Sequence, residues 1–166
     1  MGPVRVHGTE PDDGGIRVDE RMERVAVLGA GTMGHGIAQV CAMSGFGVSL
    51  FDPFPGQVEK ALGRIRANLD QGVERGKVTD EVRRLALGSL RAADGIADAV
   101  DGADLVIEAV PEQMELKTRL FAEVDRHAPS HAVLASNTSS LSVSRIAEAT
   151  GRPERVVGLH FFNPVH

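Results

Sequence analysis

Short runs of apolar residues alternate along the chain with longer segments whose apolar positions recur every three or four residues. The apolar runs are typical of strands buried on both faces of a sheet, and the spaced segments are typical of amphipathic helices. The predicted strands are residues 24–28, 48–51, 89–91, 104–108, 132–135 and 155–160. The predicted helices are residues 33–44, 57–75, 79–87, 94–100, 113–126 and 141–149.

The alternation of strands and helices predicts the fold class. It indicates right-handed βαβ units and a doubly wound α/β domain, in which helices cover both faces of a mainly parallel sheet. We expect this domain to occupy residues 24–166. The two helices within residues 57–87 are long and polar for a simple crossover, so we expect them to protrude as a pair.

Residues 1–23 have a different composition. They contain two prolines, two glycines in succession, many charged side chains and few large apolar groups. Such a segment buries too little apolar surface to offset its ordering entropy, so we expect a mobile N-terminal arm. A solvated leader is the preferred interpretation, with a functional role for the arm as the alternative.

Composition and charge exclude several classes of protein. Hydrophobic residues make up 42% and charged residues 25%, as in an ordinary globular domain. No apolar stretch approaches the roughly 20 residues of a membrane span, and the first residues carry no secretory signal. A net charge of −5 argues against binding to nucleic acid or to an anionic membrane surface.

The single cysteine, Cys41, excludes an internal disulfide and a cysteine-rich zinc site. A reducing cytoplasm fits this cysteine usage best, so we expect a cytoplasmic protein. The histidines show no metal-ligand spacing with one another or with Cys41, and we expect no metal.

The segment Gly29-Ala30-Gly31-Thr32-Met33-Gly34 fits the pattern G-x-G-x-x-G between a predicted strand and a predicted helix. In that position Gly29 permits the tight turn, Gly31 lets a pyrophosphate approach the backbone, and Gly34 lets the helix pack closely on the strand. Thr32 and Met33 open the helix, whose N-terminus offers free N–H groups and partial positive charge.

An acid follows the next predicted strand. Asp52 lies 18 residues beyond Gly34, where a carboxylate accepts hydrogen bonds from the adenosine ribose hydroxyls. The carboxylate would repel a 2′-phosphate, and no basic residue follows closely, so NAD is favoured over NADP. A structural turn with a solvated aspartate is the less favoured alternative. The pattern therefore predicts a Rossmann-type dinucleotide-binding domain with NAD as cofactor.

Polar residues follow three further predicted strands, at the edge where a parallel sheet forms its binding crevice. Glu112 and Lys117 follow the strand at 104–108, and a helix-start acid with a solvated lysine is an equally weighted alternative. Asn137 and Ser139 belong to a run of five polar residues after the next strand, which also suits the cap of a following helix.

The last predicted strand ends in His160-Phe161-Phe162-Asn163-Pro164. A histidine exchanges protons near neutral pH, so His160 beside Asn163 is a candidate acid–base group. A packed structural histidine is an alternative of about equal weight.

Taken together, GAGTMGHGIAQVCAMSG, FDPF, EAVPE, SNTSSLSV and GLHFFNPVH resemble the L-3-hydroxyacyl-CoA dehydrogenase family, including its 3-hydroxybutyryl-CoA members. The resemblance covers residues 24–166 and implies an NAD-dependent oxidoreductase that interconverts L-3-hydroxyacyl-CoA and 3-oxoacyl-CoA. It implies that His160 is the catalytic acid–base group and that Ser139 contacts the substrate near the reacting oxygen. Asn137 and Asn163 match polar residues around the substrate and nicotinamide.

The same resemblance implies that Asp52 binds the ribose and that Glu112 and Lys117 lie on the cofactor side. It places Asn68 and Arg75, on the first protruding helix, where the family uses a serine and a lysine to hold coenzyme A.

The family also has a downstream glutamate that orients the histidine and a C-terminal helical domain that forms most of a homodimer interface. This chain stops before both, so we expect it to bind NAD but to turn over substrate poorly.

Two other functions remain open at this point. A related dehydrogenase could act on a carrier-protein thioester or a 3-hydroxy acid. This alternative stays open because Asn68 and Arg75 stand where the family uses a serine and a lysine to hold coenzyme A. A non-catalytic NAD-binding protein is the third interpretation, against which the retention of His160, Ser139 and Asn163 together counts.

Overall fold

The computed structural model describes residues 22–165, so residues 1–21 of the expected N-terminal arm lie outside the described part of the chain. Its centre is one sheet with the strand order β3-β2-β1-β4-β5-β6, and all five neighbouring pairs are parallel. This order confirms the predicted doubly wound α/β fold.

The strands are β1 (Arg24–Leu28), β2 (Gly47–Phe51), β3 (Leu90–Ala92), β4 (Leu105–Glu108), β5 (Val133–Ser136) and β6 (Val156–Gly158). The helices are α1 (Thr32–Met43), α2 (Gln57–Glu74), α3 (Asp80–Ser89), α4 (Ile96–Val100), α5 (Met114–His127) and α6 (Val143–Ala147), with a 3₁₀ turn at Pro153–Arg155.

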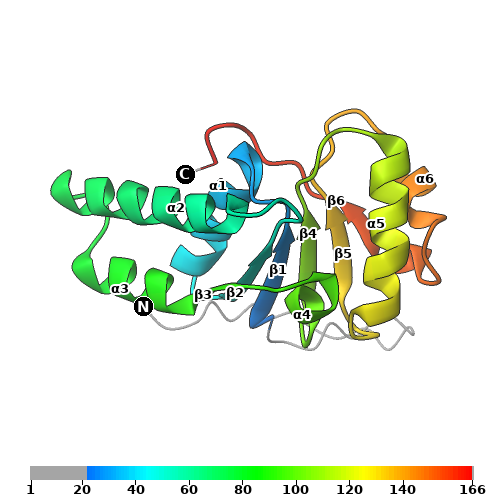
Figure 1. Cartoon of the computed structure of the whole chain (residues 1–166), viewed down its shortest axis with the longest axis horizontal. Helices are drawn as coiled ribbons and strands as arrows, with labels where there is room; N and C mark the ends of the chain where they lie inside the picture. Colours follow the sequence, from blue (N-terminus) through cyan, green and yellow to red (C-terminus); the bar gives the residue numbers. More distant parts are fainter. Residues whose placement is uncertain (1–21, 166) are drawn as a thin grey trace, which may run out of the picture.

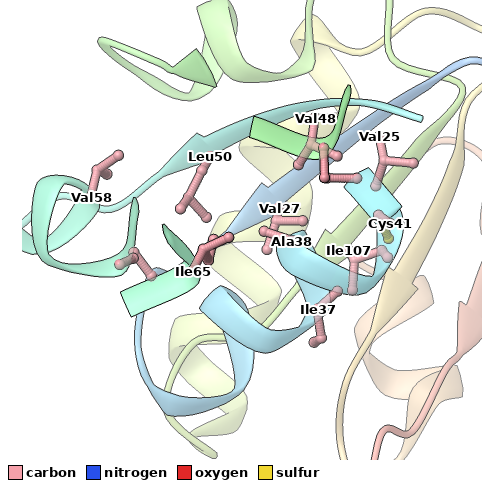
Figure 2. Packing of buried hydrophobic residues seen from close by; sticks show 14 of the residues in the cluster. Val25, Val27, Ile37, Ala38, Cys41, Val48, Leu50, Val58, Ile65 and Ile107 are labelled. Carbon is pink, nitrogen blue, oxygen red and sulfur yellow. The ribbon is translucent and has the colours of Figure 1, made fainter. Parts of the chain in front are cut away.

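Alternate residues of the central strands face two separate cores. On one face Val25 and Val27 of β1 pack with α1, α2 and α3, as Figure 2 shows from close by. On the other face Ala26 and Leu28 pack with α4, α5 and α6. Cys41 lies in the first core, where burial raises the pKa of its thiol to about 11, so the thiol stays protonated at neutral pH.

The helix ends follow the capping residues of the sequence. Thr79 caps α3 by accepting a hydrogen bond from the Val82 N–H at 3.2 Å, and Ser142 caps α6 by accepting one from the Arg145 N–H at 3.3 Å. The paired helices α2 and α3 extend beyond the sheet on the side of β3, as predicted (Figure 1).

Most element boundaries differ from the prediction by one or two residues, and the following differences are the most informative. The helix predicted at 94–100 begins at Ile96, the helix predicted at 141–149 spans only Val143–Ala147, and the 3₁₀ turn before β6 was not predicted. The last strand was expected to run to His160 but ends at Gly158. Beyond it the chain leaves the sheet, and the last sheet-like bond is donated by the Leu159 N–H to the Ser136 carbonyl at 3.0 Å. His160 therefore lies in an irregular segment.

Candidate functional site

The glycine loop joins β1 to α1, and its three glycines have different surroundings. Gly29 has a φ of +102°, and a Cβ there would lie 2.7 Å from the Ala109 carbonyl oxygen. A Cβ on Gly34 would lie only 1.7 Å from the Gly29 carbonyl oxygen. At Gly31, by contrast, a Cβ would meet nothing within 4 Å. Gly29 and Gly34 therefore leave no room for a side chain, whereas a ligand can approach the backbone at Gly31.

The start of α1 offers unpaired hydrogen-bond donors. Its N-cap is Gly31, which provides no side-chain cap, and its first turn carries no acid. Within residues 22–165, the N–H groups of Thr32 and Met33 have no hydrogen-bond acceptor. Free N–H groups at the start of a twelve-residue helix bind phosphate, so this end of the sheet fits the pyrophosphate of NAD.

Asp52 follows β2 and is tied to the same loop. Its Oδ2 accepts a hydrogen bond from the Ala30 N–H at 2.8 Å, and its Oδ1 accepts one from the Phe54 N–H at 3.0 Å. These bonds fix the carboxylate beside the glycine loop. Each oxygen keeps acceptor capacity for a ribose hydroxyl, because a carboxylate oxygen has two lone pairs.

Lys117 is completely buried, and the alternative of a solvated lysine is wrong. Its Nζ lies 2.7 and 2.8 Å from the two carboxylate oxygens of Glu108 and 3.1 Å from Oε2 of Glu112. The Lys117 and Glu108 side chains are 0% and 1% exposed. Lys117 begins the buried stripe of α5, which continues through Leu120 and Phe121. In this structure its amine contacts protein carboxylates, not the surface of the crevice.

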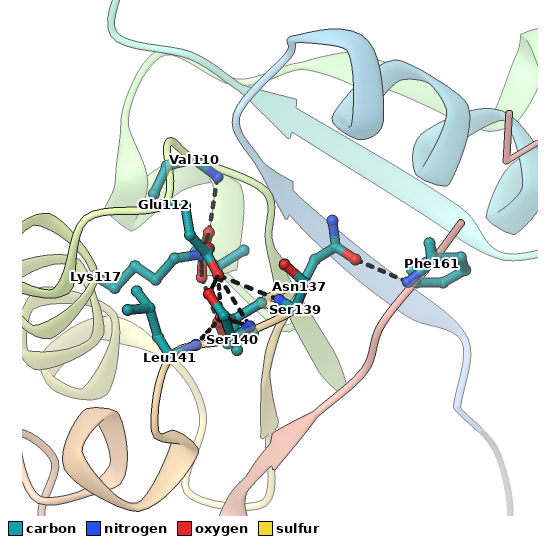
Figure 3. A network of polar contacts seen from close by, with 11 residues as sticks. Val110, Glu112, Lys117, Asn137, Ser139, Ser140, Leu141 and Phe161 are labelled. Carbon is teal, nitrogen blue, oxygen red and sulfur yellow. Dashed lines mark hydrogen bonds and ion pairs between the residues drawn. The ribbon is translucent and has the colours of Figure 1, made fainter. Parts of the chain in front are cut away.

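Glu112 connects this buried pair to the loop after β5, as Figure 3 shows. Its Oε1 accepts hydrogen bonds from the Thr138 hydroxyl and from the backbone N–H groups of Ser139 and Ser140, at 3.2 and 3.4 Å. Burial raises the pKa of Glu112, but the hydrogen bonds from Thr138 and Lys117 outweigh it and hold the pKa at about 2. Glu112 is therefore a carboxylate that fixes the loop carrying Ser139.

Asn137 connects the loop after β5 to the segment after β6. Its Oδ1 accepts a hydrogen bond from the Phe161 N–H at 2.8 Å (Figure 3). The neighbouring His160 is exposed, and its ring centroid lies 4.8 Å from that of Phe162. Ser139 and Asn163 are also exposed at this edge of the sheet. The imidazole has no hydrogen-bonded acid within the described chain.

Asn68, on α2, and Arg75, which caps the C-terminus of α2, lie apart from the strand ends. Both line a groove of about 750 Å³ between α1, α2 and the α2–α3 turn, together with Lys77. Pro164 and Val165, just beyond the His160 segment, form part of its wall. Asn68 also donates a hydrogen bond from Nδ2 to Oε1 of Gln39 at 3.0 Å, which ties α2 to α1.

Sequence reasoning missed several residues at this site. Glu108, the last residue of the predicted strand 104–108, turns inward and accepts a hydrogen bond from the Ser136 hydroxyl at 2.6 Å. Thr138 was not singled out, although it is buried and donates to Glu112. The sequence does contain a signal for the buried pair, because Lys117 stands at helical spacing before Leu120 and Phe121.

Two further properties concern the described residues alone. No group of three or more histidine, cysteine, aspartate or glutamate side chains in residues 22–165 is arranged to hold a metal ion. Over the same residues, no helix has the length and apolarity to cross a membrane.

The strand order, the glycine loop at the β1–α1 turn and the acid after β2 define a dinucleotide-binding domain of the Rossmann type. The family described as "3-hydroxyacyl-CoA dehydrogenase, NAD binding domain" matches residues 24–166. The chain belongs to this family, and its cofactor is NAD.

Named relatives agree with this assignment. A 3-hydroxybutyryl-CoA dehydrogenase of Mycobacterium tuberculosis is 46% identical over 149 residues, which are 89% of this chain and 52% of that protein. A probable 3-hydroxybutyryl-CoA dehydrogenase of Bacillus subtilis is 42% identical over 144 residues, covering 87% of this chain and 50% of its own length. The crystal structure of (S)-3-hydroxybutyryl-CoA dehydrogenase from Ralstonia eutropha superposes with a TM-score of 0.83 at 36% identity, over 87% of this chain and 51% of that one. The chain thus spans about half the length of the curated relatives it matches.

Proposed function

We propose that this chain is the NAD-binding part of an enzyme that interconverts L-3-hydroxyacyl-CoA and 3-oxoacyl-CoA thioesters. The observation that carries the proposal is the groove between α1 and α2. Its lining includes Arg75 and Lys77 together with Pro164, which closely follows His160 and Asn163 in the chain. Basic side chains attract the phosphates of coenzyme A, and the same groove is bordered by the segment that carries the histidine. A small 3-hydroxy acid would need no such groove.

The chain's own residues supply positioning and proton transfer. In the oxidation, His160 accepts the proton of the 3-hydroxyl group, and in the reduction it returns that proton. Ser139 presents a hydroxyl at the neighbouring strand end, and Asn163 an amide. When bound, NAD supplies the acceptor for the hydride that leaves C3.

Further parts of the proposal concern the whole protein. The matched segment covers only about half of each relative, and we propose that a C-terminal helical domain completes the active site and mediates a homodimer. We propose a cytoplasmic enzyme with an N-terminal arm that ends before Glu23. Glu23, which was expected to belong to the arm, is bonded to the domain, since its N–H donates to Oδ2 of Asp104 at 2.8 Å and its carbonyl oxygen accepts from the Gly47 N–H at 2.9 Å.

The substrate proposal is tested by calorimetry on the NAD-loaded chain. Acetoacetyl-CoA is expected to bind at least tenfold more tightly than acetoacetate. The charge reversals Arg75→Glu and Lys77→Glu together are expected to remove most of that preference. Arg84→Glu, which changes an exposed arginine of α3 away from the groove, serves as the control. Equal binding of the two ligands, or no effect of the double reversal, would refute the proposed thioester.

The proposed acid–base role is tested in the protein that carries the second half present in the relatives. His160→Gln is expected to lower kcat by about two to four decades and to leave the Kd for NAD nearly unchanged. A collapse of NAD binding would instead make His160 a structural residue.

A further inference from the structure

We propose that Asn137 is a positioning residue for His160, which it holds through the N–H group of Phe161. This inference rests on the proposed acid–base role of His160 and names the group that fixes it. The side-chain oxygen of Asn137 and the backbone nitrogen of Phe161 are 2.8 Å apart. Figure 3 shows this bond as the link between the loop after β5 and the segment after β6.

The segment that carries His160 has few other attachments. Within the described chain, the bond to Asn137 is the only hydrogen bond made by residues 160–165. Sheet pairing ends earlier, at the Leu159 N–H. The remaining attachments are apolar, because Leu159, Phe161 and Val165 pack against the core of α1 and α2. Apolar packing is non-directional, so it leaves the orientation of the backbone to the single hydrogen bond.

The bonded N–H belongs to the peptide that joins His160 to Phe161. A peptide is planar, so its N–H, the His160 carbonyl and the two flanking Cα atoms move as one group. Holding the N–H at the Asn137 oxygen therefore restrains the ψ angle of His160, and with it the direction in which the His160 Cα–Cβ bond leaves the backbone. The imidazole then keeps only its own side-chain rotations, one of which places it against the Phe162 ring.

Asn137 is itself rigidly held. Its N–H donates to the Glu108 carbonyl oxygen at 2.9 Å, and the preceding residue, Ser136, is completely buried and bonded to the Glu108 carboxylate. The Phe161 N–H is a donor, so it requires an acceptor and assigns the amide oxygen of Asn137 to this side. The amide NH₂ group consequently points away from Phe161.

The test uses the 166-residue chain and three variants, followed by NMR. Asn137→Ala removes the acceptor, whereas Asn137→Asp keeps an acceptor oxygen in the same place. Thr150→Val is the matched control, because it removes a side chain-to-backbone bond of 2.8 Å to Ala147 at the end of α6, outside the segment that carries His160. The readouts are amide hydrogen exchange of Phe161, the ring signals of His160 and its cross-relaxation with the Phe162 ring.

In Asn137→Ala, the Phe161 amide is expected to exchange about five- to tenfold faster, the factor for losing one ordinary hydrogen bond. The His160 ring signals are expected to move to free-histidine positions and to lose contact with Phe162. Asn137→Asp is expected to restore both readouts, and Thr150→Val to change neither. Protection of the Leu159 amide reports whether the sheet itself remains folded, and if Asn137→Ala is unfolded, Asn137→Ser takes its place.

Unchanged Phe161 exchange in Asn137→Ala, or equal behaviour of the alanine and aspartate variants, would overturn the inference. These readouts require no turnover, so they separate this inference from the proposed function. An ordered His160 in a full-length protein that lacks dehydrogenase activity would refute the function alone.

Discussion

Lys117→Met tests the buried ion pair most directly. Methionine keeps the length and helix propensity of the lysine side chain but removes the charge that neutralises Glu108. The Glu108 carboxylate would then remain buried beside Ser136 without its cation, since the two side chains of the pair are 0% and 1% exposed. An uncompensated buried charge is strongly destabilising, so the variant is expected to be less stable than the natural chain.

The magnitude follows from the bonds that remain. Breaking a buried pair by removing one partner costs about 3–5 kcal/mol. Glu108 keeps two donors, the Ser136 hydroxyl at 2.6 Å and the Val110 N–H at 2.8 Å, which places the cost near the lower limit. We therefore expect a loss of about 3 kcal/mol in the free energy of unfolding, equivalent to a decrease in Tm of about 6–12 °C for a chain of this length.

The assay is urea unfolding followed by circular dichroism, because the chain contains no tryptophan or tyrosine for fluorescence. Lys60→Met is the matched control, since Lys60 lies on the exposed face of α2 and its replacement is expected to change stability by less than about 0.5 kcal/mol. The double variant Glu108→Gln/Lys117→Met is expected to recover at least half of the loss, because it removes the unpaired charge as well.

Two results would contradict this reasoning. One is a Lys117→Met chain within about 1 kcal/mol of the natural chain, which would mean that water or rearrangement already compensates Glu108. The other is a double variant no more stable than Lys117→Met, which would place the cost in lost packing around the lysine stem.

Three other predictions concern the crevice. Gly34→Ala is expected to destabilise the fold and abolish NAD binding, because the new Cβ would lie 1.7 Å from the Gly29 carbonyl oxygen. Gly31→Ala has open space around its Cβ, so it is expected to keep its Tm and to raise the Kd for NAD at least tenfold in calorimetry. Asp52→Ala is expected to weaken NAD binding and to narrow its preference over NADP, whereas an unchanged preference would refute the ribose assignment. Glu112 has a folded-state pKa of about 2 against an ordinary value of 4.5, so its stabilisation is present above about pH 4.5 and is lost as the pH falls toward 2. The stability difference between the natural chain and Glu112→Gln is expected to be about 1 kcal/mol at pH 7, because the side chain is 37% exposed. In acid titrations followed by circular dichroism, most of this difference is expected to be lost by about pH 2.

Much of the fold could be predicted because it depends on local patterns. Buried strands such as β1 and β4 are continuous apolar runs, and their parallel order follows from the intervening helices. Caps such as Thr79 and Ser142 are visible as single residue types before amphipathic segments. The glycine loop was recognisable for the same reason, since Gly29 and Gly34 leave no room for a Cβ.

The misses involve interactions between distant segments. β6 ends where β5 no longer provides residues for strand pairing, and no residue near Gly158 marks that point in the sequence. The inward turn of Glu108 depends on Lys117, nine residues later, and on Ser136, on another strand. A charged residue at the end of a strand is normally solvated, so only the three-dimensional pairing reveals that it is buried.

The motif residues at the strand ends therefore have two roles: some fix the loops, and others face the exposed edge of the sheet. The loops after β4, β5 and β6 are held together largely by side chains, with Glu112 bonded to the Ser139 backbone and Asn137 bonded to the Phe161 backbone. A sequence comparison treats such residues alike as parts of an active site, although Glu112 and Lys117 are bonded to each other and to further protein groups in this structure. These bonds fix the backbone of the loops that carry Ser139 and His160, whose side chains are exposed at this edge of the sheet. Fixed placement of reacting groups is what a hydride transfer between two bound molecules requires, because misplacement of about 1 Å is already costly in rate.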